Sequence, residues 1–215
     1  YVSLVEGSGF IVRMDEDIGY LTCQNLRMWL DKGYTAMPVS VNVSRLHFND
    51  GTLIDKLVHL TDKYRLPRHL LELELTESAF FDNENALIQC MYELQSRGFV
   101  FSMDDFGTGY SSLSSLRDLP FNIVKLGRTF ISDGTDNERG QIVARNTIAL
   151  AKDLKMSIVA EGVETLEHAR FLMSCGCNCA QGFYYSQPLD EATFEVLSFI
   201  QEKAFWVDSL LDQDA

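Results

Sequence analysis

The sequence of 215 residues predicts an α/β fold built on a parallel β-sheet. Two observations predict it. Apolar runs of strand length alternate with helix-like segments six times along the chain, and each run ends in polar side chains. Helical crossovers connect parallel strands, and parallel sheets place their functional sites at the carboxyl ends of the strands. A closed barrel and an open sheet both satisfy this pattern.

The first predicted element is a helix with one apolar face, which ends at Lys32 and Gly33. The residues predicted on this face recur at roughly helical spacing and are Ile18, Leu21, Leu26, Trp29 and Leu30. We expect Trp29 to lie in the core.

Six predicted strands follow, and polar residues come at or just after their ends. The strands cover residues 38–41, 71–73, 99–103, 123–124, 157–160 and 179–180. The polar residues are Asn42 and Ser44; Glu74, Thr76 and Glu77; Asp104 and Asp105; Lys125; Glu161 and Glu164; and Gln181. Helix-like segments cover 55–64, 83–97, 113–117, 141–155 and 166–175. A closing amphipathic helix is expected over 190–204, with a buried side made of Phe194, Leu197, Ile200 and Phe205.

A closed β/α barrel has eight strands and about 250 residues, so the six predicted strands leave two unaccounted for. The chain also opens at Tyr1 without an initiator Met and goes straight into a helix-like stretch. We therefore expect a fragment of one compact domain over residues 1–215, in which residues 190–215 form a closing helix and tail. The apolar content of 46% and the lack of a linker or low-complexity tract favour a single core.

Composition narrows the class of partner and the compartment. The formal net charge of −13 argues against a nucleic-acid polymer, which needs a basic surface. No apolar run is long enough for a membrane span, and no signal peptide is visible. The cytoplasmic part of a membrane-anchored parent chain is the alternative to a cytoplasmic protein. The odd count of five cysteines, with Cys175, Cys177 and Cys179 in alternate positions, fits reduced thiols in a cytoplasmic protein better than a zinc site. None of the four histidines follows a predicted strand.

Asp104 and Asp105 close an apolar run and open a glycine-containing turn at Gly107 and Gly109. Two adjacent carboxylates at the end of a buried strand repel each other unless a cation or a proton lies between them, so we expect a divalent metal. An acidic, solvated turn is the alternative. A phosphorylated ligand beside such carboxylates would require cations to offset the repulsion.

Five motifs in order carry a family resemblance. They are Val-Asn-Val-Ser at 41–44, Glu-Leu-Thr-Glu-Ser at 74–78, Asp-Asp-Phe-Gly-Thr-Gly-Tyr-Ser-Ser-Leu at 104–113, Val-Ala-Glu-Gly-Val-Glu-Thr at 159–165 and Ala-Gln-Gly-Phe at 180–183. Over about 4–189, the chain resembles the EAL domain family of cyclic-di-GMP phosphodiesterases. The resemblance implies a (β/α)8 TIM-like barrel of EAL type, here missing the first two strands. It also implies two divalent cations, Mg²⁺ or Mn²⁺, and hydrolysis of cyclic-di-GMP to the linear dinucleotide.

The resemblance also implies metal ligands, position by position. Asn42, Glu74 and Asp104 would hold one metal. Asp104, Asp105 and Glu161 would serve the second, with Asp104 bridging the two. For Asn42 the alternative is an ordinary buried amide that satisfies backbone groups.

Three further roles come from the same resemblance. Lys125 would place a positive charge or a proton relay beside the attacking water, and Gln181 would orient that water. Glu77 would tie down the loop after Asp105, a loop linked to dimerisation in the family, so a homodimer is expected. The alternatives are a structural salt bridge for Lys125 and a buried amide for Gln181.

Two departures from the family pattern bear on activity. The Glu-Ala-Leu segment does not occur in the sequence, and Gly127 stands where the family carries an Asp two residues after Lys125. Loss of that Asp is expected to weaken the second metal or misplace the nucleophile. We favour a degenerate domain that binds cyclic-di-GMP with weak or no hydrolysis, within a parent chain that carries further signalling domains. An active phosphodiesterase and an interaction scaffold are the alternatives.

Overall fold

Six parallel strands form one sheet in the computed structural model, which describes residues 10–49, 51–76, 84–107, 113–131 and 137–200. The strands are β1 (Val39–Asn42), β2 (Leu71–Thr76), β3 (Val100–Phe106), β4 (Ile123–Leu126), β5 (Ser157–Glu161) and β6 (Ala180–Gln181). Each strand pairs with the next one along the chain. This sequential order is that of a β/α barrel wall, because a doubly wound sheet reverses its order at a switch point. The α/β prediction is confirmed, and the strands form part of a barrel.

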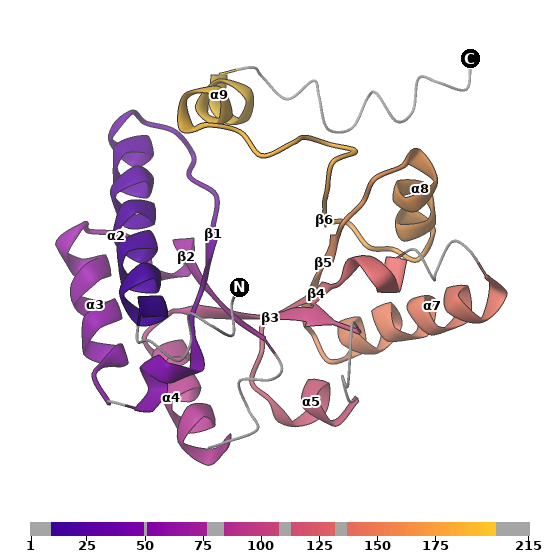
Figure 1. Ribbon diagram of the computed structural model, residues 1–215, viewed down its shortest axis with the longest axis horizontal. Helices are drawn as coiled ribbons and strands as arrows, with labels where there is room; N and C mark the ends of the chain where they lie inside the picture. The colour runs from indigo at the N-terminus through magenta and orange to yellow at the C-terminus, as the bar shows by residue number, and fades with distance from the viewer. Residues whose placement is uncertain (1–9, 50, 77–83, 108–112, 132–136, 201–215) are drawn as a thin grey trace.

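Helices follow the strands and surround the sheet on its outer side (Figure 1). They are α2 (Phe10–Asp31), α3 (Leu53–Lys63), α4 (Glu84–Ser96), α5 (Leu113–Asp118), α7 (Glu138–Asp153) and α8 (Leu166–Ser174), with 3₁₀ turns η1 (Arg45–Asn49) and η2 (Arg68–Leu70). The predicted helix bounds hold to within three residues. The largest difference is the start of α7, where the Asn137 side chain accepts a hydrogen bond from the backbone N–H of Gly140 at 2.7 Å and begins the helix early.

Residues alternate between the two faces of the sheet, and this alternation separates the core from the site. The outward-facing set is apolar and buried against the helices: Val41, Leu71, Leu73, Leu75, Phe101, Met103, Val124, Leu126, Ile158 and Ala160. The inward-facing set is largely polar and includes Ser40, Asn42, Glu72, Glu74, Ser102, Asp104, Lys125 and Glu161. The inner face therefore carries the chemistry of this domain.

The apolar face predicted for the first helix is partly wrong. Ile18 and Leu21 are 43% and 56% exposed, whereas Gly19, Cys23 and Leu26 are buried. Spacings of four and three residues place these last three on one face of α2, and Ile18 and Leu21 project to the side of it. Trp29 is buried in the core, as predicted.

The closing helix begins as α9 (Glu191–Glu195) and continues as a π-helical turn, η4 (Val196–Ile200). Phe194, predicted on the buried side, packs on Trp29 with ring centroids 5.4 Å apart. Leu197, predicted on the buried side, is 40% exposed, and Phe199 packs on Trp29 in its place. A π-turn inserts one extra residue, so the residue five positions after Phe194 comes to its face. Phe205 lies outside the described residues.

No described helix is both long and apolar enough to cross a lipid bilayer. All five cysteines are free thiols, as the composition predicted, and Cys23 and Cys177 are buried.

Candidate metal centre

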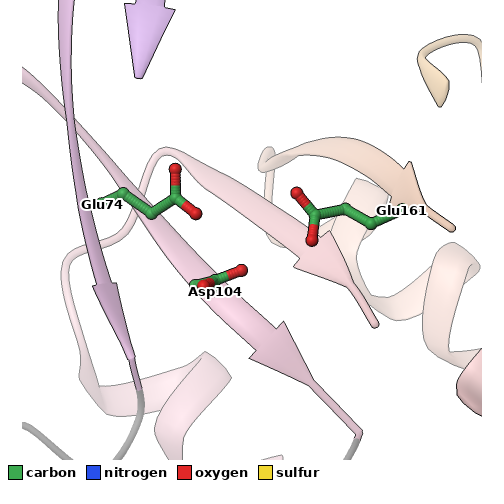
Figure 2. A group of neighbouring side chains, drawn as sticks. All are labelled: Glu74, Asp104 and Glu161. Carbon is green, nitrogen blue, oxygen red and sulfur yellow. The ribbon is translucent and has the colours of Figure 1, made fainter. Parts of the chain in front are cut away.

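Three carboxylates converge on the inner face of the sheet, one each from β2, β3 and β5 (Figure 2). Glu74, Asp104 and Glu161 each offer an oxygen atom, and these atoms all lie within 4.8 Å of one another. The parallel register explains the convergence. Thr76 pairs with Asp104 across β2 and β3, so Glu74 and Asp104 reach the same edge of the sheet. We call these three residues the carboxylate cluster.

Lys125 on β4 is the cation of this cluster. Its Nζ atom donates to Glu74 Oε2 at 2.5 Å and lies 3.4 Å from Glu161 Oε1. The side chain is only 6% exposed. Burial opposes the charge, but the hydrogen bond and the negative charges of Glu74 and Glu161 outweigh burial, so the pKa of Lys125 is raised. Lys125 is therefore positively charged at neutral pH.

The charges of the cluster do not balance. Burial, followed by repulsion from Glu74, Glu161 and Asp105, raises the pKa of Asp104 to about 7. The pKa of Glu161 is raised as well, mainly by burial, although Lys125 acts in the opposite direction. One buried ammonium cannot neutralise this group of carboxylates, so a proton or a further cation is required. Carboxylate oxygens are the ligands that Mg²⁺ and Mn²⁺ prefer, and the cluster fits such an ion.

Asp105, the immediate neighbour of Asp104, lies outside the carboxylate cluster. The pairing of β3 with β4 shifts register between Met103 and Phe106, and Asp105 has a positive φ of 53°. Its backbone N–H donates to Asp104 Oδ1 at 2.8 Å, while its own side chain is exposed. The bulge thus sends the two adjacent carboxylates in different directions. A metal-binding role for Asp105 stays a prediction.

The remaining predicted site residues lie around the cluster. Asn42 at the end of β1 is in register with Glu74, and Gln181 on β6 is in register with Glu161. Both are exposed on the strand ends beside the cluster. Gly127 is buried directly after β4, where its N–H donates to the Phe106 carbonyl at 3.2 Å. Glu77 lies outside the described residues.

Three inward-facing residues of the site were not predicted from the sequence. Ser40 accepts a hydrogen bond from Lys125 Nζ at 3.3 Å, and Glu72 is a buried carboxylate two residues before Glu74. The Ser102 Oγ atom, two residues before Asp104, is buried without a hydrogen-bond partner among the described residues. The period-two alternation of a strand places each of them on the same face as a predicted site residue, and this alternation could have identified them.

The comparisons with known proteins agree with this geometry. The family model described as EAL domain matches residues 1–188. The signaling protein YkoW of Bacillus subtilis is 35% identical over 195 residues, which are 91% of this chain and 24% of YkoW. The cyclic di-GMP phosphodiesterase NbdA of Pseudomonas aeruginosa is 36% identical over 195 residues, which are 91% of this chain and 25% of NbdA. The chain thus spans about a quarter of the length of these curated relatives.

Solved structures are also similar to this chain. The PaMucR phosphodiesterase in complex with c-di-GMP has a TM-score of 0.82 and 34% identity, and the match covers 90% of this chain and 78% of that one. The EAL domain of Mycobacterium smegmatis DcpA has a TM-score of 0.78 and 31% identity, with 83% and 80% covered. With its sequential parallel strands, its carboxylate cluster and a family match over most of its length, the chain belongs to the EAL domain family.

Proposed function

We propose that this chain is a cyclic-di-GMP-binding EAL domain in which hydrolysis of the ligand is weak or absent. One observation carries the proposal. The carboxylate cluster and Lys125 are in place, whereas Gly127, two residues after Lys125, has no side chain to offer to the same site. Binding of a phosphodiester depends on the first group of residues, and correct placement of an attacking water depends on the polar groups around it.

The residues that bind the ligand act through charge. A phosphodiester next to the carboxylate cluster would be repelled unless divalent cations offset the field. Asn42, Glu74 and Asp104 would hold one cation. Asp104, Asp105 and Glu161 would hold a second, more weakly because of Gly127. NbdA is named a cyclic di-GMP phosphodiesterase, and the PaMucR phosphodiesterase was solved in complex with c-di-GMP. Both relatives support this choice of ligand.

Such cations, when bound, lower the pKa of a coordinated water and stabilise the charge that develops on the phosphoryl oxygens. Lys125 would hold a positive charge beside the same oxygens, and the raised pKa of Lys125 keeps it protonated. Gln181 would orient a water by hydrogen bonding. These two side chains come from strands on either side of β5.

An active phosphodiesterase that releases the linear dinucleotide is the second candidate. The observation in its favour is the same convergence of Glu74, Asp104 and Glu161, which with Lys125 retains most of the residues that hydrolysis would use. We also propose that the domain works in the cytoplasm, as a homodimer and as one part of a longer signalling protein. The free thiols support the cytoplasmic location. The greater length of the relatives supports a longer signalling protein.

Turnover and binding, measured separately, test the proposal. The protein is incubated with cyclic-di-GMP and Mn²⁺, and linear dinucleotide is quantified by chromatography, while binding is measured by calorimetry with Ca²⁺ in place of Mn²⁺. We expect binding with little product, and a rise of about 10-fold or more in product for Gly127→Asp. The backbone at Gly127 has no positive φ, so it accepts an Asp.

Asn146→Asp adds the same charge on an exposed position of α7 and serves as the control. Rapid hydrolysis by the unchanged chain, abolished by Glu74→Gln, would establish the active enzyme instead. Absence of cyclic-di-GMP binding would leave only the scaffold.

A further inference from the structure

A cavity of about 310 Å³ lies between α2, α3 and the outer side of β1, and Asn42 at the end of β1 is part of its lining. Figure 1 shows these two helices side by side. Most of the wall is apolar and comes from Val41, Val43, Leu53, Leu57, Leu60 and Leu71. A space of this size is at the small end of the range for ligand pockets.

The cavity exists because α2 carries a glycine where it faces α3. Gly19 is buried in the middle of a 22-residue helix, a position where glycine destabilises the helix relative to alanine. The backbone does not require it, because the φ of Gly19 is not positive. Packing does not require it either, since an added Cβ would meet only Leu60 Cδ2, at 3.7 Å. The missing side chain at Gly19 leaves part of the cavity volume unfilled.

A buried carboxylate lines this space. The Asp15 side chain is 8% exposed, and its Oδ2 atom accepts from the Ser44 backbone N–H at 2.9 Å and lies 3.2 Å from His47 Nε2. Its Oδ1 atom makes no hydrogen bond to another described residue. This oxygen is not among the described side-chain atoms that are fully buried without a hydrogen-bond partner, so it is accessible to a ligand. The cavity therefore offers one strong acceptor within an apolar wall.

The other charged groups on the wall are already engaged. Lys56 pairs with Glu16 at 2.8 Å across the two helices. Lys63 lies over the Tyr20 ring, 4.7 Å from its centroid. His59 is exposed. Asp15 is held by Ser44 and His47 through one carboxylate oxygen, and its other oxygen has no hydrogen bond to a described residue.

We propose that this cavity is a binding site for a small organic cation: an apolar, ring-sized body with an amine or amidinium group that donates to Asp15 Oδ1. The ring would fill the volume that Gly19 leaves against Leu57 and Leu60. The cationic group would complete the hydrogen bonding of the Asp15 carboxylate, whose other oxygen is held by the chain. This site does not rest on the proposed function, although Asn42 borders both the cavity and the carboxylate cluster.

Benzamidine and benzoate form a matched pair of probes, since they share shape and differ in the sign of charge. Isothermal titration calorimetry without nucleotide or metal measures both. We expect benzamidine to bind, at least about 10-fold more tightly than benzoate, because a charge-assisted hydrogen bond to Asp15 is available only to the cation.

Gly19→Leu fills the cavity, and Asp15→Asn removes the charge while keeping the shape. Each variant is expected to weaken benzamidine binding by about 10-fold or more. Gln24→Leu introduces a Leu, and Asp17→Asn removes a carboxylate charge, at exposed positions of α2; both serve as controls that leave binding unchanged.

Three results would overturn the proposal: no benzamidine binding at millimolar concentration, equal affinity for benzoate, or unchanged affinity in Asp15→Asn. Should Gly19→Leu fail to fold, amide NMR shifts of the unsubstituted protein decide the question. We expect benzamidine to move the amide signals of Ser44 and His47, and shifts confined to other elements would reject the site.

Discussion

Lys125 and Glu74 form a buried ion pair across two strands that are not neighbours: Nζ on β4 lies 2.5 Å from Oε2 on β2, and β3 runs between them. Both side chains are less than 10% exposed. Because the pair crosses the inner face of the sheet over β3, it holds the Lys125 ammonium group among the carboxylates of the cluster. The same contact is therefore a structural link and a part of the site.

Removing the cation alone should destabilise the fold. In Lys125→Met the Glu74 carboxylate stays buried without its partner, and we expect the free energy of unfolding of the metal-free protein to fall by about 3 kcal/mol. Urea denaturation in EDTA measures this. Arg145→Met, at an exposed position of α7, is the control. Glu74→Gln in the Lys125→Met background should recover part of the loss, and strictly additive effects would show that the pair is not coupled.

Asp104 should make the metal-free protein less stable as the pH rises. Its pKa is about 7 in the fold and about 3.9 in an unfolded chain. Between these values the folded state binds more protons than the unfolded state, so this group's contribution to stability falls as the pH rises from about 4 to about 7.

The test compares urea denaturation at pH 5 and pH 8 in EDTA. Asp104→Asn cannot ionise and is expected to lose less stability between these pH values than the unsubstituted protein. Asp153→Asn, on the exposed side of α7, should behave like the unsubstituted protein. Identical pH profiles for Asp104→Asn and the unsubstituted protein would show that Asp104 ionises freely.

A divalent cation should stabilise the fold through the carboxylate cluster. At a concentration 100 times the dissociation constant, Mn²⁺ is expected to add about 2.7 kcal/mol. Differential scanning fluorimetry over a Mn²⁺ series measures the shift in Tm. Glu161→Gln should remove most of the shift, whereas Glu167→Gln in the first turn of α8 should leave it intact. A shift that survives in Glu161→Gln would place the cation elsewhere.

The π-helical turn at the end of α9 can be tested by paired truncations. Phe199 stacks on Tyr34 with ring centroids 4.9 Å apart and also contacts Trp29, so Phe199→Ala should cost about 3 kcal/mol. Leu197 is 40% exposed, so Leu197→Ala should cost less than about 0.5 kcal/mol. Chemical denaturation of the two variants gives the answer, and the reverse order of effects would restore the regular helical phase that the sequence predicted.

The elements and the cluster could be predicted because they depend on local patterns. The strands are apolar runs in the sequence. The last positions of four of these strands hold the site residues Glu74, Asp104, Lys125 and Glu161. Parallel pairing then brings them together without further information. The repetition alone fits both a closed barrel and an open sheet, and it is the observed pairing of each strand with the next that makes the sheet part of a barrel.

What the sequence could not predict depends on backbone irregularities and on empty space. The π-turn moved Phe199 into the place predicted for Leu197, and a bulge with a left-handed residue separated Asp105 from Asp104. Neither the π-turn nor the bulge has a characteristic amino-acid pattern by which the sequence could reveal it. The cavity beside Gly19 has no signature in the sequence, because it depends on side chains of other elements that fail to fill it.

The division of the sheet into an apolar outer face and a polar inner face lets stability and chemistry change separately. Core residues such as Leu73 and Met103 alternate along their strands with Glu74 and Asp104, so a substitution on one face leaves the packing of the other face in place. Under the proposed function, a single inner-face position such as Gly127 would decide whether the domain hydrolyses its ligand or only binds it. Substitutions on the inner face could then change the chemistry of the domain while the same apolar core holds the fold together.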